Sequence, residues 1–165
     1  MENKTNNYLW AQFGASIDML ENAINMCPEK IWNFKNDFSD FWYLVYHTLF
    51  WLDFYLTEVP EAFTPPDDIG TSELDPEGIL PYKVFNKEEL INYLHHCRNK
   101  CKKTIDNIND TNANRDYKYG SINLPYFELM LYNMRHVQHH TAQLNLLLRQ
   151  QINSAPGWVK RTVTA

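Results

Sequence analysis

The sequence is poor in glycine and contains no long apolar run. Only five of its 165 residues are glycine, which disfavours a fold built from many tight turns, because glycine supplies the positive-φ positions that such turns require. No apolar run reaches the roughly 18 residues of a membrane-spanning helix. The polar start of the chain leads into no apolar core like that of a secretion signal. We therefore predict a cytoplasmic protein with no membrane partner.

Cysteine and basic residues are also scarce. The three cysteines, Cys27, Cys97 and Cys101, are odd in number and form no C-x-x-C pair, which argues against a disulfide framework and against a zinc knuckle. We expect them to be small core or surface thiols. The 15 Lys and Arg against 20 Asp and Glu give a net charge of −5. Because nonspecific nucleic-acid binding depends on clustered basic side chains, no nucleic-acid partner is expected.

Aromatic residues and helical periodicity are abundant. The chain contains five Trp, ten Tyr and nine Phe, and its length suits one domain with one sizeable core. Apolar residues recur at three- and four-residue steps in four stretches. The predicted helices cover residues 6–27, 40–58, 87–109 and 124–151, and a tail follows at 152–165. We predict an all-α four-helix bundle that forms a single domain over residues 1–165.

Local signals define the ends of these helices. Pro28 stops the first helix, because the residue before a proline is pushed out of the α region. Ser39 is a plausible N-cap of the second helix, with Asp40 near the positive end of the helix dipole. Asn86 opens a pattern close to a capping box. Pro125 suits the first turn of the fourth helix, where the N–H that proline lacks would have no partner.

Two segments lack helical periodicity. Residues 57–86 contain five prolines and seven acidic residues, with Lys83 as the one basic residue. A connection this long inside a compact domain is either functional or partly disordered, so it is either a lid or a solvated crossover between the second and third helices. Residues 109–123, rich in Asn and Asp, predict a loop. No stretch of the chain predicts a strand.

Histidines cluster in the fourth predicted helix. His136, His139 and His140 lie within five residues of one another. Each residue of an α-helix advances about 100°, so His136 can share a metal ion with either His139 or His140, and spacing alone does not choose. Metal sites need more than two protein ligands. His47, the basic side chain on the stripe of the second helix, is the candidate third ligand, because bundles place cofactor sites on facing helices.

Other metal chemistries lack the residues they require. A zinc metalloprotease needs H-E-x-x-H, but no Glu stands between His136 and His140 to act as the base. A di-iron carboxylate bundle needs Glu-x-x-His pairs, and the chain contains none. The predicted coordination sphere is therefore made of histidine alone. Such a set suits Zn, Ni, Fe, Cu or Co, and leaves positions open for water or substrate.

The segments around these histidines have distinctive sequences. They read Trp42-Tyr43-Leu44-Val45-Tyr46-His47-Thr48-Leu49-Phe50-Trp51 and Arg135-His136-Val137-Gln138-His139-His140-Thr141-Ala142-Gln143-Leu144. They resemble the DinB-like (DinB/YfiT) superfamily of bacterial metal-binding four-helix bundles, in helix order over nearly the whole chain. The resemblance implies that the ligands are His47, His136 and His140, with Gln143 as the Gln that follows the second of the pair. Thr141-Ala142 stands where many members carry Arg-Gly, which removes no ligand.

The resemblance also implies several alternative reactions. The family includes thiol S-transferases that use low-molecular-weight thiols such as bacillithiol, a mycothiol-dependent isomerase and proteins described as metal-dependent hydrolases, and homodimers are common. We expect one divalent ion, Zn or Ni first and Fe, Mn or Co next, that activates a thiol or water. The expected partners are a small-molecule substrate, including a low-molecular-weight thiol, and a second copy of the chain. A noncatalytic bundle that binds a metal or a partner is the alternative.

Four further residues are predicted to line the site. Tyr46, Tyr132, Asn133 and Gln143 could orient a substrate there, with core packing as the alternative role of the tyrosines. Asp53, on another part of the second helix, is expected to be either solvent-facing or structural. No residue beside the ligands stands out as a general base.

Overall fold

Helices make up most of the computed structural model, which describes residues 2–34 and 40–163. The α-helices are α1 (Glu2–Met26), α2 (Glu29–Trp32), α3 (Phe41–Tyr55), α4 (Lys87–Asp106), α5 (Asp110–Ala113) and α6 (Tyr126–Ile152). The strands β1 (Asp116–Tyr119) and β2 (Ile122–Pro125) form a hairpin, and the 3₁₀ turns η1 (Pro60–Ala62) and η2 (Ser72–Leu74) lie between α3 and α4. The prediction of a mostly helical fold is confirmed. None of the helices in the described ranges has the length and apolarity needed to cross a bilayer.

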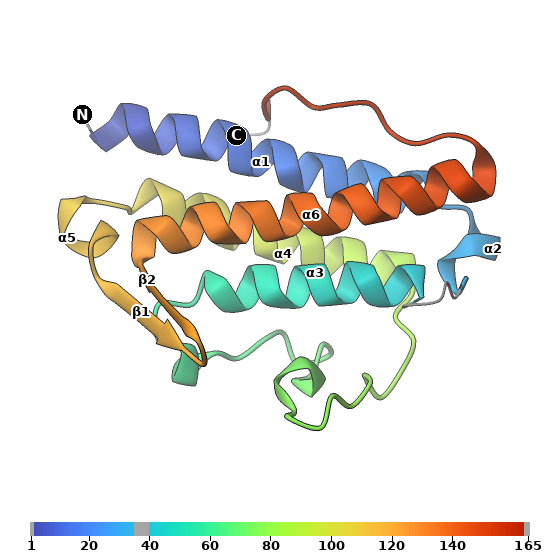
Figure 1. The fold of residues 1–165 in the computed structure, drawn as a ribbon, viewed down its shortest axis with the longest axis horizontal. Helices are drawn as coiled ribbons and strands as arrows, with labels where there is room; N and C mark the ends of the chain where they lie inside the picture. Colours follow the sequence, from blue (N-terminus) through green and yellow to red (C-terminus); the bar gives the residue numbers. More distant parts are fainter. Residues whose placement is uncertain (1, 35–39, 164–165) are drawn as a thin grey trace.

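The four long helices lie side by side (Figure 1). α3 packs against α4 and α6, and α1 packs against the same two helices. Figure 1 shows that α1 and α6 run in one direction and that α3 and α4 run in the opposite direction. After α6 the tail returns along α1, where the backbone N–H of Thr162 donates to the carbonyl of Ala11 at 3.0 Å.

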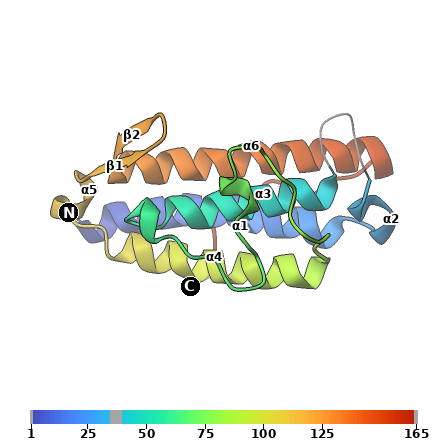
Figure 2. The ribbon, with the colours of Figure 1, turned by 90° about the horizontal axis from the view of Figure 1, so that it is seen from below.

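The connection between α3 and α4 is long because these two neighbours are parallel. A chain that leaves the end of α3 must travel back along that helix, whose 15 residues span about 22 Å, before α4 can begin. Residues 56–86, which we call the crossover, make this return over the outer face of α3 (Figure 2). In agreement with the sequence, the crossover contains no long helix.

The crossover covers the aromatic side chains of α3. Tyr46 is fully buried and stacks on Phe85 of the crossover with ring centroids 5.1 Å apart. Phe50 meets Phe63 edge-on at 5.3 Å. Such pairs add about 0.5–1.5 kcal/mol beyond the burial of their area. Because α4, α6 and the crossover surround α3, its residues are apolar on nearly all sides rather than along one stripe.

The predicted ends of the first and third helices are close to those observed. α1 ends at Met26, ahead of Pro28, but begins at residue 2 rather than at residue 6. The capping box that opens α4 is present, since the Asn86 side chain accepts the backbone N–H of Glu89 and the Glu89 side chain accepts that of Asn86. α4 ends at Asp106, before the predicted residue 109, where the chain leaves the helix through a C-cap asparagine.

The second and fourth predicted helices need small corrections. α3 ends at Tyr55, before the predicted residue 58. Its N-cap is Asp40, and Ser39, the predicted N-cap, lies outside the described residues. Pro125 is the N-cap of α6 and not part of its first turn, because this proline still belongs to β2.

The prediction of no strand, and of a loop over residues 109–123, is wrong. α5 and the β1–β2 hairpin occupy this segment and lead directly into α6. Tyr119 pairs with Ile122, so Gly120 and Ser121 form a two-residue turn in which Gly120 takes a φ of 56°, a conformation open to glycine at no steric cost. Each strand has only four residues, too few for a period of two to stand out among the surrounding Asn and Asp.

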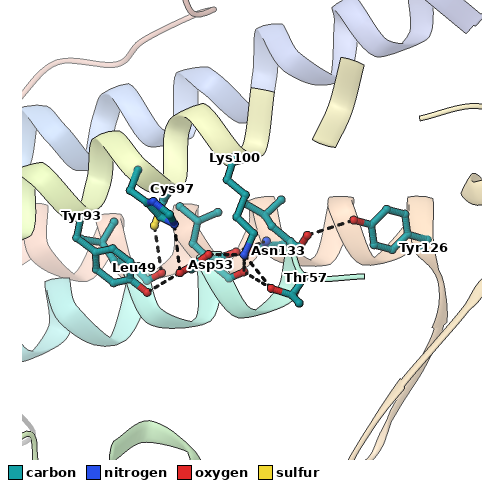
Figure 3. A network of polar contacts seen from close by, with 11 residues as sticks. Leu49, Asp53, Thr57, Tyr93, Cys97, Lys100, Tyr126 and Asn133 are labelled. Carbon is teal, nitrogen blue, oxygen red and sulfur yellow. Dashed lines mark hydrogen bonds and ion pairs between the residues drawn. The ribbon is translucent and has the colours of Figure 1, made fainter. Parts of the chain in front are cut away.

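A buried ion pair joins α3 to α4 (Figure 3). Asp53 has no exposure to solvent. One of its carboxylate oxygens lies 2.5 Å from Nζ of Lys100, and the other accepts the Tyr93 hydroxyl at 3.0 Å. Lys100 also donates to the Thr57 hydroxyl at 2.8 Å. Of the two expectations for Asp53, the solvent-facing one is wrong and the structural one is observed.

Replacing Lys100 with Met should destabilise the fold, because it removes the nearer of the two basic partners of the buried Asp53 carboxylate, the other being His96 at 3.7 Å. Breaking a buried pair usually costs about 3–5 kcal/mol. Since 28% of the Lys100 side chain is exposed, we expect the free energy of unfolding to fall by about 2–3 kcal/mol, measured by urea denaturation. The control, Lys102→Met, breaks an exposed pair with Asp106 and should cost less than about 1 kcal/mol. Equal losses in the two variants would contradict this account.

Candidate metal centre

Three histidines from two helices meet where α3 packs on α6. His47 lies on α3, and His136 and His140 lie one turn apart on α6. Each offers one ligand atom, and these atoms all lie within 4.8 Å of one another. The ring centroids are 4.5 Å apart for His136 and His140, 4.9 Å for His47 and His140, and 5.5 Å for His47 and His136. The fold thus brings together the three predicted ligands, and they could hold one metal ion.

His139, the other candidate partner of His136, is placed differently. Its ring centroid lies 5.0 Å from that of His140, but the side chain is exposed. Within the described ranges, the group of donors close enough to share an ion contains His47, His136 and His140 and not His139. The three-residue step along α6 carries His139 away from α3, whereas the four-residue step keeps His140 beside His47.

A carboxylate that the sequence did not reveal holds His47 in place. Glu73, in turn η2 of the crossover, is paired with Nδ1 of His47 at 2.8 Å. It also accepts the Trp51 indole N–H at 2.9 Å and the Tyr43 hydroxyl at 2.8 Å. Because an ionised carboxylate can only accept hydrogen bonds, His47 carries its proton on Nδ1. The Nε2 lone pair of His47 is therefore free to bind a metal.

Hydrogen bonding keeps Glu73 ionised although only 7% of its side chain is exposed. Burial by itself raises the pKa of this carboxyl, but the hydrogen bonds that it accepts from His47, Tyr43 and Trp51 bring the pKa below its ordinary value. No motif distinguishes Glu73 from the other acidic residues of the crossover. Its role arises only when the crossover folds back over α3.

Gln143 orients His140 from the same helix. Its side-chain oxygen accepts a hydrogen bond from Nδ1 of His140 at 2.7 Å, which leaves Nε2 of His140 free to bind a metal. Residues three apart on an α-helix are neighbours on its surface, so the sequence order alone is enough to create this contact. The sequence predicts that Gln143 contacts a substrate. In the structure its side chain contacts the candidate ligand His140.

Burial keeps His136 and His140 neutral. Burial, with smaller contributions from His140, His47 and His139, lowers the pKa of His136 to about 3, and burial also lowers the pKa of His140. A neutral imidazole carries the lone pair that binds a metal. Nδ1 of His136 is buried and has no hydrogen-bond partner among the described residues, although buried polar atoms normally have one. Neutral rings and an unsatisfied buried nitrogen fit a divalent cation at this position.

The other three residues that were predicted to line the site differ in their exposure to solvent. Tyr46 and Asn133 are completely buried. The Tyr46 hydroxyl is paired with the Ser72 hydroxyl at 2.9 Å, and the Asn133 amide donates to the carbonyl of Leu52 at 3.0 Å, so both join elements of the core. Tyr132 is partly exposed and lies near the candidate metal centre.

A cavity opens beside one of the three histidines. Its volume is about 340 Å³, and its lining is Tyr132, Arg135, His136 and His139 of α6. Ligand sites are usually concave spaces of this order of size with a few convergent polar groups. The candidate metal centre therefore adjoins a space that can admit a small molecule.

Comparison with known proteins places this arrangement in a family. The family model described as the DinB superfamily matches residues 12–144, a range that includes all three histidines. No curated protein matches the sequence. The predicted resemblance is confirmed, and the chain belongs to the DinB superfamily.

Proposed function

We propose that this chain is a divalent-metal-dependent enzyme, a thiol S-transferase or a hydrolase, built as one DinB-like four-helix-bundle domain over residues 1–165. The proposed ligands are His47, His136 and His140. The proposal is supported above all by the convergence of their donor atoms within 4.8 Å of one another. Zn or Ni is expected first, with Fe, Mn or Co next, because imidazole nitrogen suits metals of this class.

A metal site with three histidine ligands has a coordination position left for a reacting group. Structural zinc sites are closed by four protein ligands, whereas catalytic sites with three keep a position open. The cavity beside His136 and the 28% exposure of the His47 side chain supply an approach to that position. When bound, the ion acts as a Lewis acid that lowers the pKa of a thiol or a water molecule.

The side chains around the ligands orient them. Glu73 holds the Nδ1 proton of His47 and Gln143 holds that of His140, which keeps each ring in one tautomer and one orientation. Glu73 is nearly buried and already serves three donors, so we assign it to positioning and not to proton transfer. Tyr132 and Arg135 line the cavity beside His136 and are placed to contact a substrate.

A second candidate function is binding of a partner without catalysis. Several large apolar side chains near the end of the crossover, within residues 79–84, are half exposed or more, and these are Ile79, Leu80, Tyr82 and Val84. Exposed apolar side chains that gather in one segment are typical of interaction surfaces. In this alternative the metal is structural. The thiol partner and the homodimer that the resemblance implies remain predictions, and so does the cytoplasmic location expected from the absence of a long apolar run and the polar start of the chain.

Metal content tests the proposed ligand set directly. Protein purified without a His tag and analysed by mass spectrometry should contain close to one divalent ion per chain, and His47→Ala or His136→Ala should lose it, because two imidazoles do not hold the ion as three do. The matched variant His139→Ala should retain the metal. Wild-type protein that stays free of metal after incubation with Zn or Ni would contradict the proposal. Loss of metal in His139→Ala with retention in His140→Ala would show that the ligand pair on α6 is wrong.

Glu73→Gln should weaken metal binding without removing a ligand. The amide keeps the shape of the side chain but loses the charge that polarises His47, and loss of such a partner typically costs about 10- to 100-fold in metal affinity. Competition with a chromophoric chelator measures the affinity for Zn. Glu77→Gln is the control, because Glu77 is exposed in the same segment. Equal affinity in Glu73→Gln and wild type would show that the carboxylate does not support the site.

A further inference from the structure

Arg135 is a cation next to the candidate metal centre that pairs with no carboxylate of the described residues. It directly precedes the ligand His136 and is exposed. Arg98 and Arg115, by contrast, form ion pairs with acidic side chains. The Arg135 guanidinium lies over the Tyr132 ring, with its central carbon 5.9 Å from the ring centroid. The charge of Arg135 is therefore available to a ligand.

Arg135 lines three cavities, and two of them also include Tyr132. The first is the 340 Å³ space that also contains His136. The second has a volume of about 700 Å³ and lies between the hairpin and the first half of α6. Its lining consists of Ser121, Ile122, Asn123, Leu124, Glu128, Leu131, Tyr132 and Arg135. Because Tyr132 and Arg135 line both spaces, a ligand in the larger cavity reaches the metal centre past the guanidinium.

The larger cavity is chemically asymmetric. Ile122 and Leu124 of β2 and Leu131 of α6 give it an apolar wall. Glu128 stands two helical turns before Arg135, about 10 Å along the axis of α6, and its carboxylate repels an anion at that end. Arg135 attracts an anion at the end nearest His136. A bound molecule is therefore oriented with its negative group toward the metal centre and its apolar body toward the hairpin.

We propose that the two cavities form the substrate site and that they select a small organic anion, whose carboxylate pairs with Arg135 and whose apolar body lies against the hairpin. The planar guanidinium binds a carboxylate with two parallel hydrogen bonds, a geometry that gives orientation as well as affinity. The role of this molecule as a substrate depends on the function proposed above, but its binding does not. The hairpin, which is joined directly to α6, thereby acquires a role in recognition.

A matched pair of probes tests the charge preference. 2-Naphthoate carries a carboxylate on an apolar body, and 2-naphthamide has nearly the same shape without the charge. Calorimetric titration of wild-type protein should show the carboxylate binding at least about tenfold more tightly than the amide, in metal-free and in Zn-loaded protein alike, since a charged hydrogen-bonded pair contributes at least this much. Arg135→Gln should reduce the preference to nearly none. Arg149→Gln, which removes another exposed arginine of α6, should leave it intact.

Three results would overturn the proposal. The first is a carboxylate preference that survives in Arg135→Gln, because a group other than Arg135 then binds the anion. The second is a preference that disappears when the metal is removed, because the ion then binds the anion. The third is no measurable binding of either probe to wild-type protein. Failure of the proposed function has a different signature, which is wild-type protein that takes up no metal. In that case the metal-free titrations still decide whether Arg135 binds the anion.

Discussion

Three imidazoles share one small space between α3 and α6, and the rest of the site depends on that crowding. Rings with centroids 4.5–5.5 Å apart cannot all be protonated, because burial and mutual repulsion both oppose the charge. The low pKa of His136 follows from these two causes. What remains is a set of imidazoles in which His136 and His140 are neutral and carry lone pairs that can bind a metal. A divalent cation is the species that such a set is suited to bind.

The topology of the fold supplies the support for this set. Since α3 and α4 are parallel, the crossover returns over α3, and this path carries Glu73 to within hydrogen-bond distance of His47. Hydrogen bonds from Tyr43, His47 and Trp51 to Glu73 then attach the crossover to α3. The sequence leaves open whether this segment is a lid or a crossover. The contacts of Glu73, together with the stack of Tyr46 on Phe85, describe a crossover that is packed on the helix and contributes to the site.

Sequence periodicity was sufficient to predict the long helices and to place His47 opposite His136 and either His139 or His140, and only the family resemblance singled out His140. The step of four from His136 to His140 and the central position of His47 on its helix are properties of regular secondary structure, which local sequence determines. Glu73 could not be predicted in the same way, because it reaches His47 through an irregular segment with no period. The hairpin was missed for a related reason, since its strands are too short to show alternation. Tyr46 and Asn133 were expected to line the site, and the structure buries both side chains, with the Tyr46 hydroxyl paired with Ser72 and the Asn133 amide paired with the carbonyl of Leu52.

The open coordination position is the central claim, and cobalt spectroscopy tests it most directly. Metal-free protein loaded with Co²⁺ should show the visible absorption of a low-coordinate, nitrogen-ligated ion, and addition of 2-mercaptoethanol should produce a sulfur-to-cobalt charge-transfer band. Both signals should be lost in His47→Ala. A cobalt spectrum that is unaffected by the thiol would show a closed, structural centre. A spectrum unchanged in His47→Ala would show that α3 and α6 do not share the ion, and either result would contradict the proposed function.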